Sequence, residues 1–70
     1  MSELKITLKA ARVNANLTLD EAAERLHTTK QTLISYEKGA TYPTVDKLIE
    51  ICHLYGVRIE SILFLPKESI

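Results

Sequence analysis

Residues 19–38 carry two helix signals separated by only three residues, and this spacing constrains the fold more than any other feature of the chain. Thr18 and Glu21 form a capping-box pattern before the first signal, and Thr29 is placed to cap the second. Gly39 is placed to end the second helix in the left-handed conformation. Two helices joined this tightly must cross at a steep angle. We therefore expect two short helices packed across each other.

A close crossing of two helices needs a small residue at the contact, an apolar residue that fills the angle and a turn residue with positive φ. The sequence has a residue for each. Ala23 is small enough for the two backbones to approach, and Leu33 faces back into the angle and fills it. The break needs a residue with positive φ, which is usually glycine. His27 stands there, and histidine is one of the few other residues enriched in that conformation.

Further helix signals lie on both sides of this segment. We expect a first helix over roughly residues 6–15, a fourth between the cap Thr44 and Gly56, and a fifth over roughly residues 58–64. The first and fourth of these helices are expected to turn apolar side chains inward at Leu4, Leu8, Ala11, Val45, Leu48, Ile49, Ile51, Cys52 and Tyr55. The fifth carries Ile59, Ile62 and Leu63. The chain is therefore predicted to be all-α, with one compact five-helix domain over residues 1–65 and a short tail over residues 66–70.

Composition and charge narrow the classes of function. Nine Lys and Arg against nine Asp and Glu give a net charge of +0, which excludes binding to polyanions by bulk charge alone. The single Cys52 can form no internal disulfide, and no Cys or His pair has zinc-ligand spacing. Ser35 has no base and supporting acid in the pattern. We expect a cytoplasmic protein, away from membranes, that is not an enzyme and uses no metal, cofactor or small-molecule ligand.

The candidate binding residues lie on the outer face of the third helix. If Leu33 and Tyr36 face the core, helical geometry turns a polar set outward together: Lys30, Gln31, Ile34, Ser35 and Lys38. In a DNA major groove Gln31 can pair with adenine, Lys30 can donate to guanine, and Ser35 is a short adaptable partner. Ile34 fits a thymine methyl group. The other interpretation of these residues is an ordinary solvated helix face.

The pattern resembles the Cro/C1-type helix-turn-helix of phage repressors and bacterial XRE-like regulators. The residues that carry the resemblance run from Thr18 to Gly39 and continue with Pro43, Thr44, Leu48 and Leu54-Tyr55-Gly56-Val57. The resemblance implies a lambda-repressor-like domain whose helix-turn-helix spans about residues 19–38. It also implies a homodimer, formed in solution or only on DNA, bound to a pseudo-palindromic operator in double-stranded DNA. In that family Lys30, Gln31 and Ser35 stand at base-reading positions, and Arg12 would pair with Glu37.

Phosphate contacts are expected from the two ends of the third helix and from the loop after it, at Thr29, Thr32, Lys38, Thr41 and Tyr42. The sequence departs from the family pattern at Leu19, where a glutamine commonly meets the DNA backbone. It departs also at His27, which replaces a glycine, and in residues 40–42, which contain no basic side chain. The DNA-facing side is therefore expected to be only mildly positive.

Two hypotheses of function remain open on the sequence. The first is a sequence-specific transcriptional regulator that represses or adjusts a promoter by occupying it. The second is a protein-interaction module on the same fold, of antitoxin-like or coactivator-like kind, which the neutral charge and the apolar end of the chain favour. In either case part of the cluster Ile59, Ile62, Phe64 and Leu65 must close the core, and the remainder can form a two-fold patch between protomers.

Overall fold

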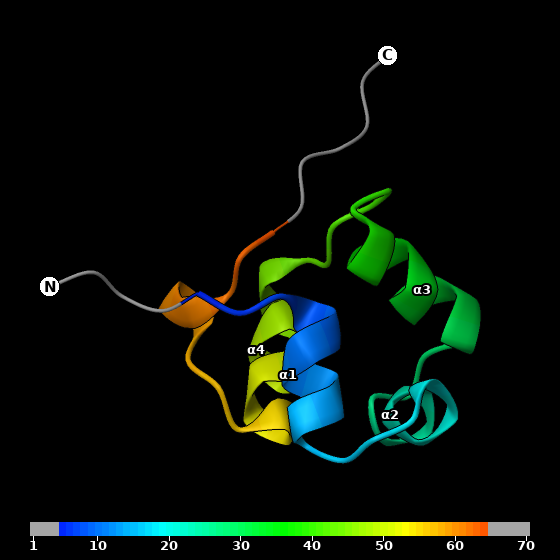
Figure 1. Ribbon diagram of the computed structural model, residues 1–70. Coiled ribbons are helices and arrows are strands. Elements are labelled where there is room, and N and C mark those ends of the chain that lie inside the picture. The colour runs from blue at the N-terminus through cyan, green and yellow to red at the C-terminus, as the bar shows by residue number, and fades with distance from the viewer. Residues whose placement is uncertain (1–4, 65–70) are drawn as a thin grey trace, which may run out of the picture.

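A computed structural model describes residues 5–64, which form four α-helices and one 3-10 turn (Figure 1). The helices are α1 (Leu8–Asn14), α2 (Leu19–Arg25), α3 (Lys30–Lys38) and α4 (Val45–Tyr55), and the turn is η1 (Ile59–Ser61). The described residues contain no strand apart from one isolated bridge. The all-α prediction is confirmed, but the prediction of five helices is wrong.

All four helices begin at a threonine cap. In each case the threonine hydroxyl accepts a hydrogen bond from the backbone N–H three residues later, and the four caps are Thr7, Thr18, Thr29 and Thr44. At Thr18 the capping box is complete, because Glu21 also accepts from the Thr18 N–H at 2.9 Å. Sequence analysis missed Thr7, so the first helix begins at Leu8 and not near Ile6.

All four helices also end in the same way. A residue with positive φ follows each helix, and the next N–H donates to a carbonyl oxygen five residues back, which is the Schellman pattern. The four residues and their φ angles are Asn16 (62°), His27 (56°), Gly39 (80°) and Gly56 (73°). The prediction that His27 adopts positive φ is confirmed. Each short helix therefore has one N-terminal N–H and at least one C-terminal carbonyl paired by local hydrogen bonds.

The expected fifth helix over residues 58–64 is only the 3-10 turn η1. The chain becomes extended directly after it, because its backbone pairs with the segment before α1. The Ile6 N–H donates to the Ser61 carbonyl and the Leu63 N–H donates to the Ile6 carbonyl, each at 2.8 Å. This parallel bridge between Ile6 and Ile62 uses the groups that a longer helix would need.

The core lies where α1, α2, α3 and α4 meet. Its buried side chains are Leu8, Ala11, Ala22, Ala23, Leu26, Leu33, Ile51, Cys52, Tyr55 and Ile62. The prediction that Val45 and Ile49 face inward is wrong, because they are 71% and 41% exposed. The apolar residues of α4 surround much of that helix, so its inward face could not be assigned from spacing alone. Leu4 lies outside the described residues.

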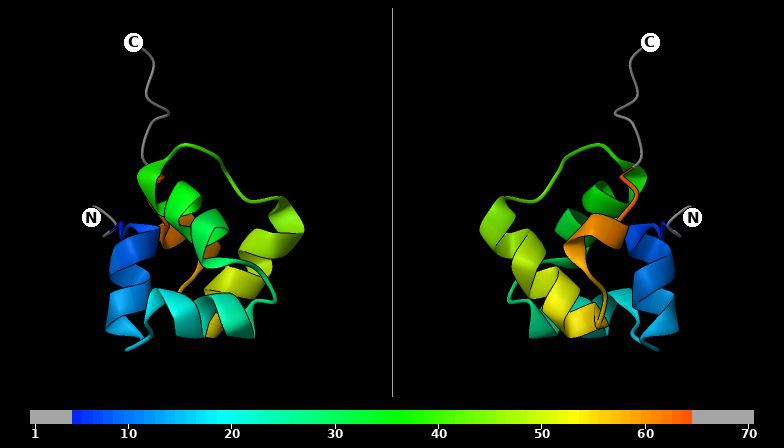
Figure 2. Two further views of the ribbon diagram at one scale, coloured as in Figure 1. Left: turned by 90° about the vertical axis from the view of Figure 1, so that its right-hand side faces the viewer. Right: turned by 90° about the vertical axis from the view of Figure 1, so that its left-hand side faces the viewer.

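The arrangement leaves α3 on the outside of the molecule. Figure 2 shows α3 facing the viewer in its left panel, with α1 to one side, α4 to the other and α2 beneath. Leu33 is the buried anchor of α3 and is 2% exposed. The helix therefore rests on its neighbours along one side only.

We predict that His27→Gly stabilises the protein by about 0.5–1 kcal/mol, because glycine adopts positive φ without the strain that a Cβ brings. The His27 side chain is exposed, so the substitution removes no core contact. Urea unfolding measures the effect. The control is Glu24→Gly at an exposed position inside α2, which should lose about 1 kcal/mol. Equal losses for the two variants would contradict a strained turn at His27.

Candidate nucleic-acid interface

The outer face of α3 presents the polar side chains that the sequence placed there. Lys30, Gln31 and Lys38 are exposed, whereas Ile34 and Ser35 are half-buried at the edge of the helix. All five belong to one helix of nine residues, so their relative spacing is fixed by helical geometry. The face combines amide, amine and hydroxyl groups with one apolar side chain.

A buried ion pair joins α1 to the last turn of α3. Arg12 Nε donates to Glu37 Oε2 at 2.7 Å, and Arg12 Nη2 donates to Glu37 Oε1 at 3.3 Å. Arg12 Nη1 also donates to the Leu17 carbonyl at 2.8 Å, so all three nitrogens of the guanidinium have partners. The two side chains are 9% and 10% exposed. The pair therefore fixes the rotation of α3 relative to α1 and to the loop before α2.

Electrostatics around this pair favour the charged guanidinium. The hydrogen bonds that Arg12 donates to the Glu37 carboxylate raise the pKa of Arg12, although burial works in the opposite direction. Tyr55 is buried nearby, and burial together with the Glu37 carboxylate raises the pKa of Tyr55 to about 12. Tyr55 is therefore neutral at ordinary pH, and it adds no second negative charge beside Glu37.

The turn between α2 and α3 is held by a lysine that sequence analysis did not single out. Lys47 Nζ donates to the Leu26 carbonyl at 2.9 Å, at the end of α2, and also contacts Glu50 at 3.2 Å. A cation is favourable at the C-terminal end of a helix dipole. The sequence did contain a clue to this contact. Lys47 lies in the first turn of α4, where a positive charge opposes the helix dipole, so a partner for it outside that helix was to be expected.

At the start of α3, two hydroxyl groups lie together. The Thr29 hydroxyl accepts from the Thr32 N–H at 3.1 Å, and the two hydroxyl oxygens are 2.8 Å apart. Thr29 is exposed and Thr32 is half-buried. The two predicted phosphate contacts of this helix end are therefore adjacent in space.

At the other end of α3, the chain turns sharply into an exposed loop. The Ser35 carbonyl accepts from the Ala40 N–H at 3.0 Å and from the Thr41 N–H at 3.4 Å. Thr41 and Tyr42 are exposed, and the Tyr42 ring lies edge-on to Phe64. The loop places these residues beyond the exposed Lys38.

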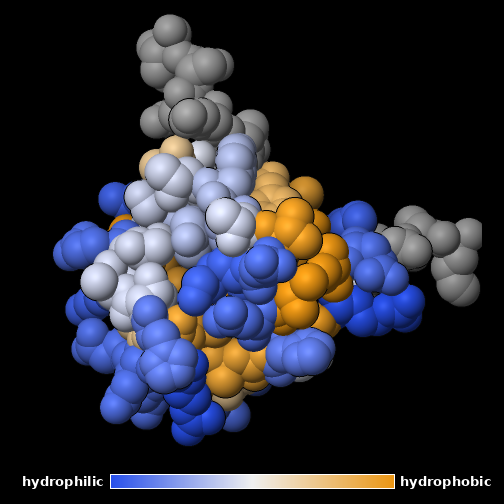
Figure 3. All heavy atoms as spheres, turned by 180° about the vertical axis from the view of Figure 1, so that it is seen from behind, coloured by the Kyte–Doolittle hydropathy of each residue, from blue (hydrophilic) through white to orange (hydrophobic). Residues whose placement is uncertain are grey.

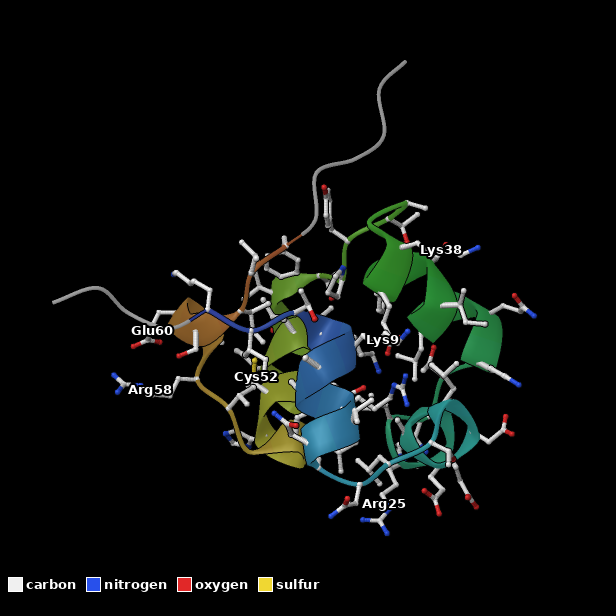
Figure 4. The ribbon with its side chains drawn as sticks, in the orientation of Figure 1. Lys9, Arg25, Lys38, Cys52, Arg58 and Glu60 are labelled. Atoms are coloured by element: carbon white, nitrogen blue, oxygen red, sulfur yellow. The ribbon has the colours of Figure 1, made fainter. Side chains whose placement is uncertain are left out.

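A shallow hollow between α1, α2 and α3 brings further residues to this surface. It is lined by Lys9, Arg12, Leu19, Ile34, Glu37 and Lys38. Figure 4 shows Lys9 between α1 and α3, and Lys38 near the end of α3. Sequence analysis did not include Lys9. The available signal was its spacing, since it lies one helical turn before Arg12 on the same helix.

Charge is unevenly distributed over the described residues. Lys9, Lys30 and Lys38 are exposed around α3, while α2 carries three exposed carboxylates at Asp20, Glu21 and Glu24. Among residues 5–64 no group of three or more His, Cys, Asp or Glu side chains could hold a metal ion. No helix in this part of the chain has the length and apolar character needed to cross a membrane.

Comparisons with known proteins agree with this geometry. The family model described as Helix-turn-helix matches residues 8–62. An uncharacterized HTH-type transcriptional regulator of Methanocaldococcus jannaschii is 37% identical over 66 residues, which cover 94% of this chain and 100% of the relative. A second uncharacterized HTH-type regulator, from Archaeoglobus fulgidus, is 25% identical over 96% of this chain and 94% of its own length.

The HTH-type transcriptional regulator ImmR of Bacillus subtilis is 38% identical over 56 residues. The match covers 80% of this chain but only 44% of ImmR, so the similarity concerns less than half of that relative. No solved structure matches this chain significantly.

We predict that Glu37→Ala lowers the free energy of unfolding by about 3–5 kcal/mol, because it leaves the Arg12 guanidinium buried without a counter-charge. Glu37→Gln keeps the size and one acceptor, so it should lose less. The control is Glu50→Ala, which breaks the more exposed pair with Lys47 and should cost less than about 1 kcal/mol. Chemical denaturation measures all three. A loss for Glu37→Ala no larger than for Glu50→Ala would show that the buried pair does not hold the fold.

Proposed function

The chain belongs to the helix-turn-helix family of Cro/C1-type, XRE-like DNA-binding transcriptional regulators, and we propose that it is a sequence-specific repressor. We place its action in the cytoplasm, at a promoter that it occupies. The single observation that carries the proposal is the one-sided packing of α3, which buries Leu33, leaves Gln31 exposed on the opposite face and leaves Lys30 exposed in the first turn.

The proposed mechanism inserts the exposed face of α3 into the major groove. Gln31 has the amide pair that recognises N6 and N7 of adenine, and Lys30 can donate to O6 and N7 of guanine. Ser35 and Ile34 stand further along the helix, where a hydroxyl can bond either kind of base edge and a methyl-rich side chain suits thymine. These four residues are the proposed base contacts.

Phosphate contacts fix the orientation of a protein on the duplex without reading sequence. We assign them to the two ends of α3 and to the loop after it, at Thr29, Thr32, Lys38, Thr41 and Tyr42. Lys9 joins this set because it lines the same hollow as Lys38. Only two of the six are cations, so phosphate neutralisation by each protomer is modest.

We infer further that two copies bind one operator. A recognition helix of nine residues reads only a half-site, and two domains about 34 Å apart are needed to read two successive major grooves. Exposed apolar side chains available for such a contact lie on α4, on η1 and directly after it: Val45, Ile49, Ile59 and Leu63. Figure 3 shows apolar atoms gathered on the face seen from behind. Ile62 belongs instead to the core, and Leu65 lies outside the described residues.

Selection of bound sequences from random duplex DNA tests the proposed function as a whole. The expected result is a pseudo-palindrome whose half-sites are about one helical turn apart. A failure to enrich any sequence, together with tight and salt-insensitive binding to a protein, would replace this proposal with the interaction-module hypothesis.

Within that selected sequence, we predict that Gln31→Ala weakens binding by about 1–3 kcal/mol and relaxes the preference at one base pair. Lys38→Ala should weaken binding to selected and random duplexes equally. The logarithm of the binding constant should fall with the logarithm of salt concentration with a slope of roughly −2 per protomer, because two lysines of each protomer contact phosphates. Fluorescence anisotropy over a salt series measures these quantities. A slope near zero, or equal losses for both variants on both duplexes, would contradict the assignment.

For the dimer, we predict that Leu63→Lys abolishes two-to-one binding to the selected duplex and leaves the fold intact. Leu63 is 47% exposed, so a charge there disturbs a partner more than the core. Sedimentation of the complex measures the stoichiometry. Val13→Lys on α1, at a residue 52% exposed and outside the apolar set, is the control. Unchanged stoichiometry for Leu63→Lys would remove this surface from the dimer contact.

A further inference from the structure

Tyr42 and Phe64 join two parts of the chain that are far apart in sequence. Their ring centroids are 5.7 Å apart and their planes meet at 87°, which is the favourable edge-to-face geometry for aromatic rings. Tyr42 lies in the loop between α3 and α4, whereas Phe64 lies in the extended segment after η1. The two rings, with Pro43 and Leu48, line one apolar hollow.

Phe64 is attached to a well-anchored part of the fold. Ile62, two residues earlier, is 6% exposed and belongs to the core. The Leu63 N–H donates to the Ile6 carbonyl at 2.8 Å, which ties the same segment to the residues just before α1. Phe64 also lines a small hollow with Tyr36 and Glu37 of α3. Its ring is therefore held in a fixed place beside the end of the recognition helix.

The loop that carries Tyr42 is attached at both of its ends. At its start the Ala40 and Thr41 N–H groups donate to the Ser35 carbonyl, and at its end Thr44 caps α4. Tyr42 stands between these two attachments and is 47% exposed. The Phe64 ring gives the middle of this loop a packing partner from another part of the fold.

We infer that Phe64 is a positioning residue for DNA binding, which acts by holding Tyr42 and its loop in register with α3 against the phosphate backbone. This inference rests on the proposed function. Phe64 itself is not required to touch DNA, because its ring supports Tyr42 from the side. A phosphate contact is useful only if it forms at the same time as the base contacts of α3, so fixing the loop beforehand favours binding.

A double-mutant cycle on the selected duplex tests the inference. Phe64→Ala and Tyr42→Ala should each weaken binding about three- to tenfold, on selected and random sequences alike. The double variant should bind no more weakly than Tyr42→Ala alone, because Phe64 acts only through Tyr42. Losses that multiply in the double variant, or wild-type affinity for Phe64→Ala, would overturn the inference.

Three controls separate positioning from a general role in stability or assembly. Phe64→Tyr keeps the ring and should restore binding. Val13→Ala removes an exposed apolar side chain of α1 that lies outside both the hollow with Tyr42 and the proposed dimer contact, so it should leave binding unchanged. Thermal unfolding and sedimentation should show every variant folded and in the same assembly state as the wild type. Failure of Phe64→Tyr to restore binding would count against the ring contact.

The two proposals fail in different ways. If the wild-type protein binds no duplex, both the proposed function and this inference are wrong. If the wild type binds its selected sequence and the preference at the Gln31 base pair is intact, but Phe64 and Tyr42 act independently, only the positioning role falls.

Discussion

The buried pair of Arg12 and Glu37 is the interaction on which the arrangement of the molecule depends. Burying two charges is favourable only when the geometry is good and the remaining hydrogen-bonding groups have partners. Here the guanidinium satisfies that condition, because it contacts both carboxylate oxygens and the Leu17 carbonyl. One side chain thus joins α1, the loop before α2 and the last turn of α3. With Glu37 turned inward, helical geometry leaves Gln31 and Lys38 exposed on the outer surface.

Hydrogen bonds at the helix ends add stability to helices that are short. The four helices have 7, 7, 9 and 11 residues, and isolated helices this short are unstable in water. Each is bounded by a threonine hydroxyl and by a residue with positive φ, so some of its terminal backbone groups find partners within a few residues. Tertiary packing supplies the remaining stability and fixes how the helices lie relative to one another. Lys47 does this for the helix-turn-helix, since it reaches from α4 to the end of α2.

A structural feature of this molecule could be predicted from the sequence where the residues that determine it lie close together in the chain. The bounds of α3 and α4 followed from caps and glycines that lie within a few residues of the helix ends. The fifth helix was predicted wrongly because its backbone pairs with Ile6, which no local pattern near residues 58–64 reveals. The outward position of Val45 could not be predicted, because apolar residues surround much of α4. At the candidate interface, the exposed face of α3 followed from periodicity, whereas Arg12 and Glu37 came from family resemblance. Lys9 and the ring contact of Tyr42 with Phe64 needed the tertiary structure.

We propose that the side of α3 opposite Leu33 is the surface that meets DNA. The most direct test is a titration of the isotope-labelled protein with its selected duplex, followed through backbone amide chemical shifts in nuclear magnetic resonance spectra. The largest changes should fall on Thr29, Gln31, Ser35 and Lys38 and continue into residues 40–42. Changes confined to the apolar surface of α4 and residues 59–64, with α3 unaffected, would contradict it.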